Sequence, residues 1–272
     1  MNQNVLEALA ASWKKESSGQ VQRAIWNRAA ADYRAKPLPG LAESDFLRRM
    51  GERIPLNSEV RTLDVGCGAG VYSLALAKAG VQAVGVDISD GMIDGARARA
   101  EEMGLGDASF SCMDWSEADV DSLGFRGQFD VVFAHMTPAV HDFATLDKLN
   151  ACSRNLCMVE KPTRRTDFVL NETFAAIGLP ISDYDSDMPK LFTYLWAKGY
   201  EPEFFYRKEE WNPERSTEDM VAWCTNRARL QRELTPEEEA VISSVVNAHS
   251  DCGKVRERTV TTCVTVIWRV EK

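Results

Sequence analysis

The sequence is poor in histidine and lacks paired cysteines. Both shortages argue against a disulfide framework or a metal site. It has three histidines among 272 residues, and its seven cysteines include no C-x-x-C pair. An odd number of scattered cysteines does not suit a disulfide framework, and a structural zinc site needs pairs of ligands at short spacings. We therefore expect reduced thiols, a cytoplasmic location and no bound metal. The cysteines stand at positions 67, 112, 152, 157, 224, 252 and 263.

Long apolar runs and an excess of positive charge are also missing. No stretch approaches the ~18 consecutive apolar residues of a membrane-spanning helix, and the opening "MNQNVLEALAASWKK" lacks the basic start and apolar run of a signal peptide. The net charge of −9 disfavours capture of DNA or RNA, which requires a basic surface. We expect neither a membrane nor a nucleic-acid partner.

Strand and helix patterns alternate over about 100 residues of the chain and predict a parallel sheet with helices on both faces. Apolar spacing predicts helices over 3–35 and 42–54 ahead of this region, and after Pro162 the alternation loosens. The seven expected strands are 61–66, 81–88, 108–115, 129–135, 155–161, 201–211 and 258–270. The other expected helices are 70–80, 89–104, 145–154, 188–198, 216–230 and 235–249.

A glycine-rich turn, "LDVGCGAG" (63–70), follows the first strand of this sheet. Glycines let the backbone turn sharply and admit a ligand that Cβ atoms would obstruct. The dinucleotide fingerprint G-x-G-x-x-G fails, because Val71 stands three residues after Gly68. This departure counts against a nicotinamide-dependent oxidoreductase, which is the first alternative function.

Three acidic residues accompany the first three strands. Asp64 lies inside the first strand, where its carboxylate would repel a pyrophosphate and attract a cation. Asp87 ends the second strand, where such folds bind a ribose diol, and Asp114 ends the third, where it suits an exocyclic amine. A ligand with a ribose, an adenine amine and a positive charge, but no phosphate, is S-adenosyl-L-methionine (SAM).

At this point the chain resembles the class I SAM-dependent methyltransferases. The resemblance covers about residues 20–162 and rests on "LDVGCGAG", "VGVDIS", "MDW" and "FDVVFAH", with "IWNRAAADYRAK" matching the W-[DN]-x-x-A-x-x-Y helix of many small-molecule members. It implies a Rossmann-like, seven-stranded, mostly parallel sheet with an antiparallel last strand. The implied organisation is an N-terminal helical lid (1–55), a SAM-binding core (56–162) and a C-terminal part (163–272) with a helical insertion at about 213–252.

The resemblance also assigns cofactor contacts. Asp64 would lie near the methionine ammonium, Asp87 would bind the ribose and Asp114 the adenine amine, while Tyr33 would cover the cofactor. A simple strand-end turn for Asp114 and Trp115, and ordinary core packing for Tyr33, are the alternatives. The remaining implied contacts are Gly66, Cys67, Gly68, Ile88, Met92, Trp115 and Ala134.

Two positions depart from the family pattern. The "LKPGG" turn of many members is replaced by "CSRNLCMVEKP" (152–162), so this loop is expected to be built differently. The [DN]-P-P-[YF] motif of enzymes that methylate amino groups of nucleic acids and protein glutamine is replaced by "HMTP" (135–138). This replacement argues against methylation of nucleic bases by that mechanism.

His135 is the candidate catalytic residue, because it directly follows the fourth strand, at the edge where ligands of parallel sheets bind. A loop residue bonded to backbone is the alternative for His135, and a substrate role ranks lower for His141. His249 is expected to be solvated, and a metal site at His135, His141 and Asp142 matches no zinc spacing.

The expected function is methyl transfer to a small molecule, whose acceptor atom the sequence leaves open. The aromatic-rich region at about 163–255 is expected to select this acceptor. A non-catalytic protein that binds SAM or S-adenosylhomocysteine (SAH) is the second alternative function. A homodimer is left open.

Overall fold

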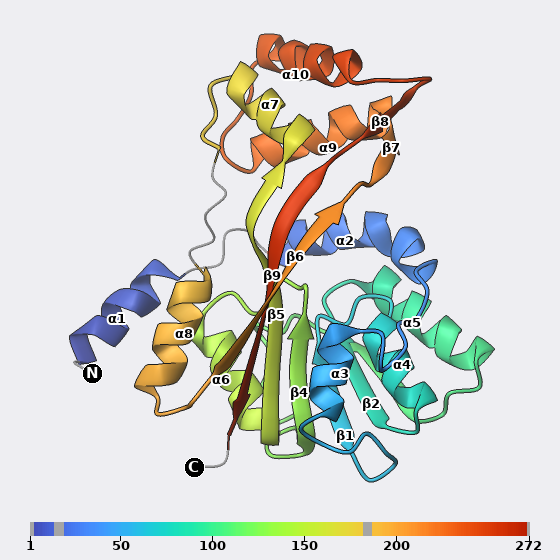
Figure 1. Cartoon of the computed structure of the whole chain (residues 1–272), viewed down its shortest axis with the longest axis vertical. Coiled ribbons are helices and arrows are strands. Elements are labelled where there is room, and N and C mark those ends of the chain that lie inside the picture. The colour runs from blue at the N-terminus through green and yellow to red at the C-terminus, as the bar shows by residue number, and fades with distance from the viewer. Residues whose placement is uncertain (1–2, 14–18, 182–186, 271–272) are drawn as a thin grey trace. The chain divides into compact units, whose positions relative to one another are not determined.

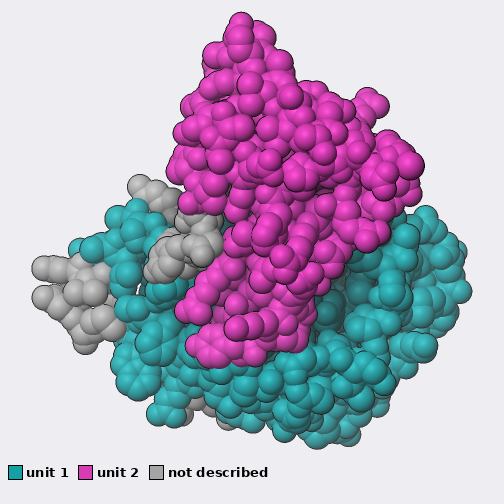
Figure 2. All heavy atoms as spheres, turned by 45° about the horizontal axis from the view of Figure 1, so that its top comes forward, with its two compact units in different colours: residues 1–161, 187–205, 265–272 teal, residues 162–186, 206–264 magenta. Residues whose placement is uncertain are grey.

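The computed structural model describes residues 3–13, 19–181 and 187–270. The chain forms two compact units (Figure 2). Unit 1 contains residues 1–161, 187–205 and 265–272, and unit 2 contains residues 162–186 and 206–264. The predicted helix over 3–35 corresponds to α1 (Gln3–Ser12) and α2 (Gly19–Arg34), and its part at 14–18 lies outside the described residues.

A seven-stranded sheet has the order β3-β2-β1-β4-β5-β9-β6. The pairs β1–β2, β1–β4, β2–β3 and β4–β5 are parallel, whereas β9 runs in the opposite direction (Figure 1). The predicted Rossmann-like sheet with an antiparallel last strand is therefore confirmed. The strands are β1 Arg61–Val65, β2 Gln82–Asp87, β3 Ala108–Cys112, β4 Phe129–His135, β5 Ser153–Asp167, β6 Glu203–Trp211 and β9 Thr259–Arg269.

Helices of unit 1 pack on this sheet through apolar faces. One core cluster joins α3 and α4 to β2, β4, β5 and β9, and another joins α4 and α5 to β3. Ser89 begins α5 by accepting a hydrogen bond from the Met92 N–H. The further helices of unit 1 are α3 Asp45–Gly51, α4 Val71–Lys78, α5 Asp90–Glu102, α6 Phe143–Cys152 and α8 Asp187–Ala197.

Unit 2 has a separate apolar core between three helices. Thr235 begins α10 with a capping box, in which Thr235 and Glu238 exchange hydrogen bonds and Pro236 is the first helical residue. The predicted insertion at about 213–252 falls within this unit, which also contains one helix that the sequence pattern did not predict, α7 Phe168–Ala176. The other elements are β7 Glu214–Ser216, α9 Thr217–Arg229, α10 Pro236–Ala248 and β8 Lys254–Arg256.

Candidate functional site

The turn between β1 and α4 is held in left-handed backbone conformations. Gly66, Gly68 and Gly70 have φ angles of +74°, +53° and +74°, which L side chains rarely adopt. The N–H groups of Gly66 and Cys67 donate to the carbonyl of Val86 at 2.7 and 3.0 Å, so the turn is bonded to β2. The chain thereby reverses over the carboxyl edge of the sheet, and three of the five residues from 66 to 70 carry no side chain.

The loop after β4 lies directly on this turn. A Cβ atom added at Gly66 would stand 2.0 Å from Oγ1 of Thr137, which follows His135 by two residues. Such an atom would collide, so glycine is required at position 66 by packing as well as by backbone conformation. The glycine turn and the residues after β4 are therefore packed directly against each other.

Asp87 connects the end of β2 to the same turn. Its two carboxylate oxygens accept hydrogen bonds from the N–H groups of Gly68 and Ser89, each at 2.9 Å. Burial raises the pKa of Asp87, and the two backbone hydrogen bonds oppose that rise. The carboxylate is thus fixed at the carboxyl edge, where a ribose diol would meet it.

Asp64 is a buried acid in β1, next to the turn. It is 3% exposed, and its Oδ2 accepts a 2.7 Å hydrogen bond from the hydroxyl of Ser73 in α4. Burial, together with the charge of Asp87, raises the pKa of Asp64 to about 7. A cation near these two carboxyl groups would be stabilised, which fits the ammonium and sulfonium of SAM.

The third acid, Asp114, follows β3 and lies against the start of α2. Its Oδ1 accepts hydrogen bonds from the N–H and hydroxyl of Ser116, at 2.9 and 2.6 Å. A Cβ atom at Gly19 would lie 2.5 Å from Oδ2 of Asp114 and 3.4 Å from Cδ1 of Ile88. The first residue of α2 therefore contacts the two side chains expected to hold the adenine.

Helix α2 lies along α5 and reaches the glycine turn. A Cβ atom at Gly68 would lie 3.7 Å from both Cδ1 of Tyr33 and Sδ of Met92, so these two side chains flank the turn. The Tyr33 ring also contacts Trp26 edge-on and stacks under the ammonium of Lys36, 3.4 Å from the ring centroid. These contacts give Tyr33 a packing role in addition to its predicted place beside the cofactor.

A methyltransferase-domain family model matches residues 56–175, which include the glycine turn and all three acids. The chain is also 28% identical to the ubiquinone biosynthesis O-methyltransferase of Ruegeria pomeroyi over 209 residues, covering 72% of this chain and 80% of that protein. The chain belongs to the class I SAM-dependent methyltransferases. The predicted family, enzyme class and cofactor are thereby confirmed.

Other similarities to this methyltransferase are shorter or more distant. The ubiquinone biosynthesis O-methyltransferase of Roseobacter denitrificans is 31% identical over 151 residues, and the match spans 55% of this chain and only 56% of that protein. The YcgJ protein structure from Bacillus has a TM-score of 0.53 at 17% identity, covering 84% of this chain and 97% of its own. The structure of the [4+2]-cyclase SpnF has a TM-score of 0.51, also at 17% identity, covering 91% and 96%. These two structures show a common fold.

The predicted cofactor residues of the methyltransferase divide into two groups. Asp64, Gly66, Gly68, Asp87, Ile88, Met92, Asp114 and Tyr33 gather around the glycine turn and the ends of β2 and β3. Trp115 is instead buried in the core, where its indole N–H donates 3.0 Å to the carbonyl of Thr145. Cys67 and Ala134 are also buried, and burial raises the pKa of the Cys67 thiol well above its usual range. The cofactor contacts of Trp115, Cys67 and Ala134 stay predictions.

His135 lies at the carboxyl end of β4, beside a buried acid that the sequence analysis missed. Nε2 of His135 is 3.3 Å from Oε1 of Glu160 in β5. His135 is 13% exposed, and Glu160 has no exposed surface. The signal in the sequence was the single carboxylate within the apolar run "NLCMVEK" (155–161), since a buried charge needs a partner.

The other two histidines also have partners. Nδ1 of His141 lies 3.0 Å from the carbonyl of Pro138, and Nε2 lies 3.8 Å from Asp142. His249 is partly exposed as expected, and its Nε2 lies 2.7 Å from Glu172, a pairing that the sequence did not predict. Among the described residues, no group of three or more His, Cys, Asp or Glu side chains is placed to hold a metal ion.

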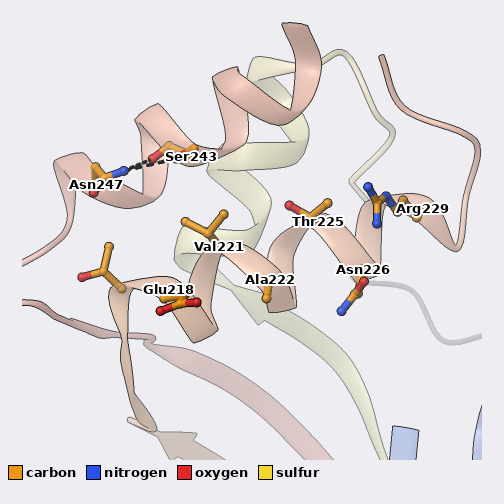
Figure 3. A pocket seen from close by; sticks show the side chains of 9 residues that line it. Glu218, Val221, Ala222, Thr225, Asn226, Arg229, Ser243 and Asn247 are labelled. Carbon is orange, nitrogen blue, oxygen red and sulfur yellow. Dashed lines mark hydrogen bonds between the residues drawn. The ribbon is translucent and has the colours of Figure 1, made fainter. Parts of the chain in front are cut away.

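A separate open pocket of 530 Å³ lies between α9 and α10 in unit 2 (Figure 3). Polar residues such as Asn226 and Arg229 of α9 and Asn247 of α10 line it together with Val221 and Ala222 of α9. None of the predicted SAM residues lines it.

Proposed function

We propose that this methyltransferase transfers the methyl group of SAM to a hydroxyl group of a small molecule. The observation that carries the proposal is His135 at the carboxyl end of β4, where the following Thr137 lies against Gly66 of the cofactor turn. A hydroxyl acceptor must lose a proton during methylation, and an imidazole beside the cofactor is suited to accept it. The O-methyltransferase names of the Ruegeria and Roseobacter relatives support the same acceptor atom.

The residues of the chain have two tasks in this reaction. When bound, SAM supplies a methyl group that its positively charged sulfur already activates for displacement. Asp87 and Asp114 would orient the nucleoside, and Asp64 with the glycine turn would orient the amino-acid end. Orientation of two reactants is worth roughly 7–11 kcal/mol, and proton removal by a base such as His135 adds ~10²–10⁴-fold.

The proposal also includes the location of the protein, its partners and its oligomeric state. We place the protein in the cytoplasm, supported by seven free cysteines. Among the described residues, no helix has the length and apolar character to cross a membrane. We propose no nucleic-acid partner, because of the net charge of −9. A homodimer stays a prediction, which light scattering of the purified protein would test.

The cofactor is tested first, by the melting temperature of the protein with SAM, SAH or NADH. A rise with SAM and SAH is expected, whereas a rise with NADH alone would favour the oxidoreductase alternative. Transfer of labelled methyl groups to matched phenol, thiol and amine acceptors then tests the reaction. Methylated phenol that disappears in His135→Asn, with SAM binding retained, is the expected result.

A non-catalytic SAM-binding protein is the competing function. It would show the SAM and SAH shifts without transfer to any acceptor in the panel or in a metabolite extract. The comparison with SpnF shows why the fold cannot decide between them, since that structure of the same fold is described as a cyclase. The transfer assay therefore distinguishes a methyltransferase from a non-catalytic SAM-binding protein.

A further inference from the structure

Glu160 and His135 are adjacent where β4 ends beside the middle of the parallel strand β5. The register of β4 and β5 places His135 directly opposite Glu160. The N–H of Met136 donates 2.8 Å to the carbonyl of Glu160, so the two strands remain bonded just beyond this pair. The side chains are thus brought together by the backbone of the sheet.

The carboxylate of Glu160 also accepts a hydrogen bond from the neighbouring strand β9. It has no exposed surface, and its Oε2 accepts a hydrogen bond from the hydroxyl of Thr265 in β9. A buried carboxylate is costly unless hydrogen bonds or a nearby positive charge stabilise it. Thr265 stabilises Oε2, and Oε1 lies beside the imidazole.

The His135 ring is held by aromatic neighbours. The Tyr72 ring lies at a centroid distance of 3.9 Å with an interplanar angle of 33°, and Phe46 meets the ring edge-on at 4.8 Å. Met136, the next residue, has a φ of +52°, a left-handed conformation that is uncommon without glycine and concentrates at functional sites. These contacts restrict the orientation of the imidazole.

Nε2 of His135 is the ring nitrogen that lies near the acid. It is buried and makes no hydrogen bond within the described part of the chain, yet it lies 3.3 Å from Oε1 of Glu160. Leaving a buried polar nitrogen unsatisfied is unfavourable, so a small rotation that completes an Nε2–H···Oε1 bond is favoured. Nε2 would then carry the proton of the neutral ring.

We infer that Glu160 is the positioning residue that makes His135 a base, an inference that rests on the proposed O-methylation. By accepting the Nε2–H bond, Glu160 fixes the tautomer in which Nδ1 is unprotonated. The hydroxyl proton of the acceptor moves to Nδ1, the hydroxyl oxygen bonds to the methyl carbon, and the electron pair of the carbon–sulfur bond returns to sulfur. The positive charge leaves the sulfur and appears on the imidazolium, opposite the Glu160 carboxylate.

The tautomer is testable without any acceptor, because the chain has only three histidines. Imidazole ¹⁵N shifts at pH 8, with His135 assigned by its loss in His135→Asn, should show the Nε2–H form in the natural protein. Glu160→Gln should give a mixture of tautomers, because an amide donates as well as accepts. An Nδ1–H ring in the natural protein, or an unchanged tautomer in Glu160→Gln, overturns the inference.

Turnover provides the second readout. In Glu160→Gln we expect kcat for the hydroxyl acceptor to fall about 10²-fold, the lower end of what a positioned base contributes, with KM for SAM unchanged. Glu160→Asp, which retains the charge, should recover part of the loss. The matched control is Glu172→Gln, which removes the acid of the partly exposed His249 pair and should leave kcat unchanged. A kcat in Glu160→Gln within two-fold of the natural protein contradicts the inference.

Thr265→Val keeps the test decisive if Glu160→Gln does not fold. It removes the hydroxyl at Oε2 while preserving side-chain shape, so we expect a several-fold fall in kcat and a partial change of tautomer. No change in either readout contradicts the inference. A natural protein that binds SAM but methylates no hydroxyl refutes the proposed function instead, and the ¹⁵N shifts still decide the role of Glu160.

Discussion

The hydroxyl of Ser73 donates a 2.7 Å hydrogen bond to the buried carboxyl of Asp64. Asp64 belongs to β1 and Ser73 to the first turn of α4, so this bond spans the glycine turn from one side to the other. The bond favours the charged carboxylate, but burial outweighs it and the pKa of Asp64 rises to about 7. The acid is thereby poised to respond to a bound cation.

Asp64→Asn should alter how the stability of the protein depends on pH. Because the pKa is about 7 in the folded chain and 3.8 ordinarily, the folded state binds the Asp64 proton more tightly than the unfolded state. The stabilising contribution is complete below pH 4 and is lost as pH rises to 7, by up to about 1.4 kcal/mol per pH unit. Asparagine does not titrate. In urea unfolding, the free energy of unfolding of Asp64→Asn should therefore increase relative to that of the natural protein between pH 4 and 7.

The same titration should couple to cofactor binding. A SAM ammonium near Asp64 favours its charged form, so SAM affinity should increase as pH rises from 6 to 8. Asp64→Asn should lose this increase and bind SAM more weakly at pH 8. Calorimetric titrations at three pH values would measure both effects. Parallel pH dependence in the two proteins would remove the ammonium assignment.

Asp87→Ala should abolish the rise in melting temperature caused by SAM. The substitution removes the carboxylate proposed for the ribose, and it also leaves the N–H groups of Gly68 and Ser89 without their acceptor. The matched control is Asp94→Ala, which removes an exposed acid of α5 that is paired with Arg97. We expect the control to retain the full SAM shift, and a full shift in Asp87→Ala would exclude the ribose role.

Gly66→Ala should be far more damaging than Gly80→Ala. Both residues have positive φ angles, +74° and +88°, but a Cβ at Gly66 meets Thr137 whereas a Cβ at Gly80 has nothing within 4 Å. Gly80→Ala should cost about 1–2 kcal/mol of backbone strain. Gly66→Ala should cost roughly 2–5 kcal/mol, because overpacking adds to the strain.

Unfolding by denaturant would give both free energies. The double variant Gly66→Ala with Thr137→Ala removes the closest contact, at Oγ1, and should recover part of the stability. Equal losses in Gly66→Ala and Gly80→Ala would show that Thr137 does not confine position 66.

The sheet and the places of its acids were predictable because both depend on local patterns. Strand and helix periods differ, and the carboxyl ends of parallel strands share one edge, so Asp64, Asp87 and Asp114 could be grouped before any contact was known. The direction of a side chain, by contrast, depends on tertiary packing, which local patterns do not show. The indole of Trp115, for example, is buried and bonded to the carbonyl of Thr145 in α6, a contact that the sequence did not predict.

Glu160 shows the other limit of local patterns. Its importance depends on the β4–β5 register that sets it opposite His135, and on Thr265 more than 100 residues later in the chain. No spacing along the chain carries that information. Helix α7 was missed for a related reason, since the N–H groups at its start bond to the buried carboxylate of Glu257, far away in sequence.

Asn27→Ala should loosen helix α2 from the cofactor site. Asn27 accepts hydrogen bonds from the Ser89 hydroxyl and the Gly91 N–H, and donates to Asp90 at 3.1 Å, so one side chain joins α2 to the start of α5. Since Asn27 is solvent-exposed, we expect the free energy of local opening at these bonds to fall by only about 1–2 kcal/mol.

Amide hydrogen exchange of residues 19–34 would measure this loss. SAM should also dissociate faster, because α2 contacts Asp114 and Ile88 through Gly19 and reaches Gly68 through Tyr33. The control is Arg28→Ala, an exposed change on the same helix that should leave exchange and dissociation unaltered. If Asn27→Ala exchanged no faster than Arg28→Ala, the attachment of α2 would have to depend on its packing against Gly91 and Gly95.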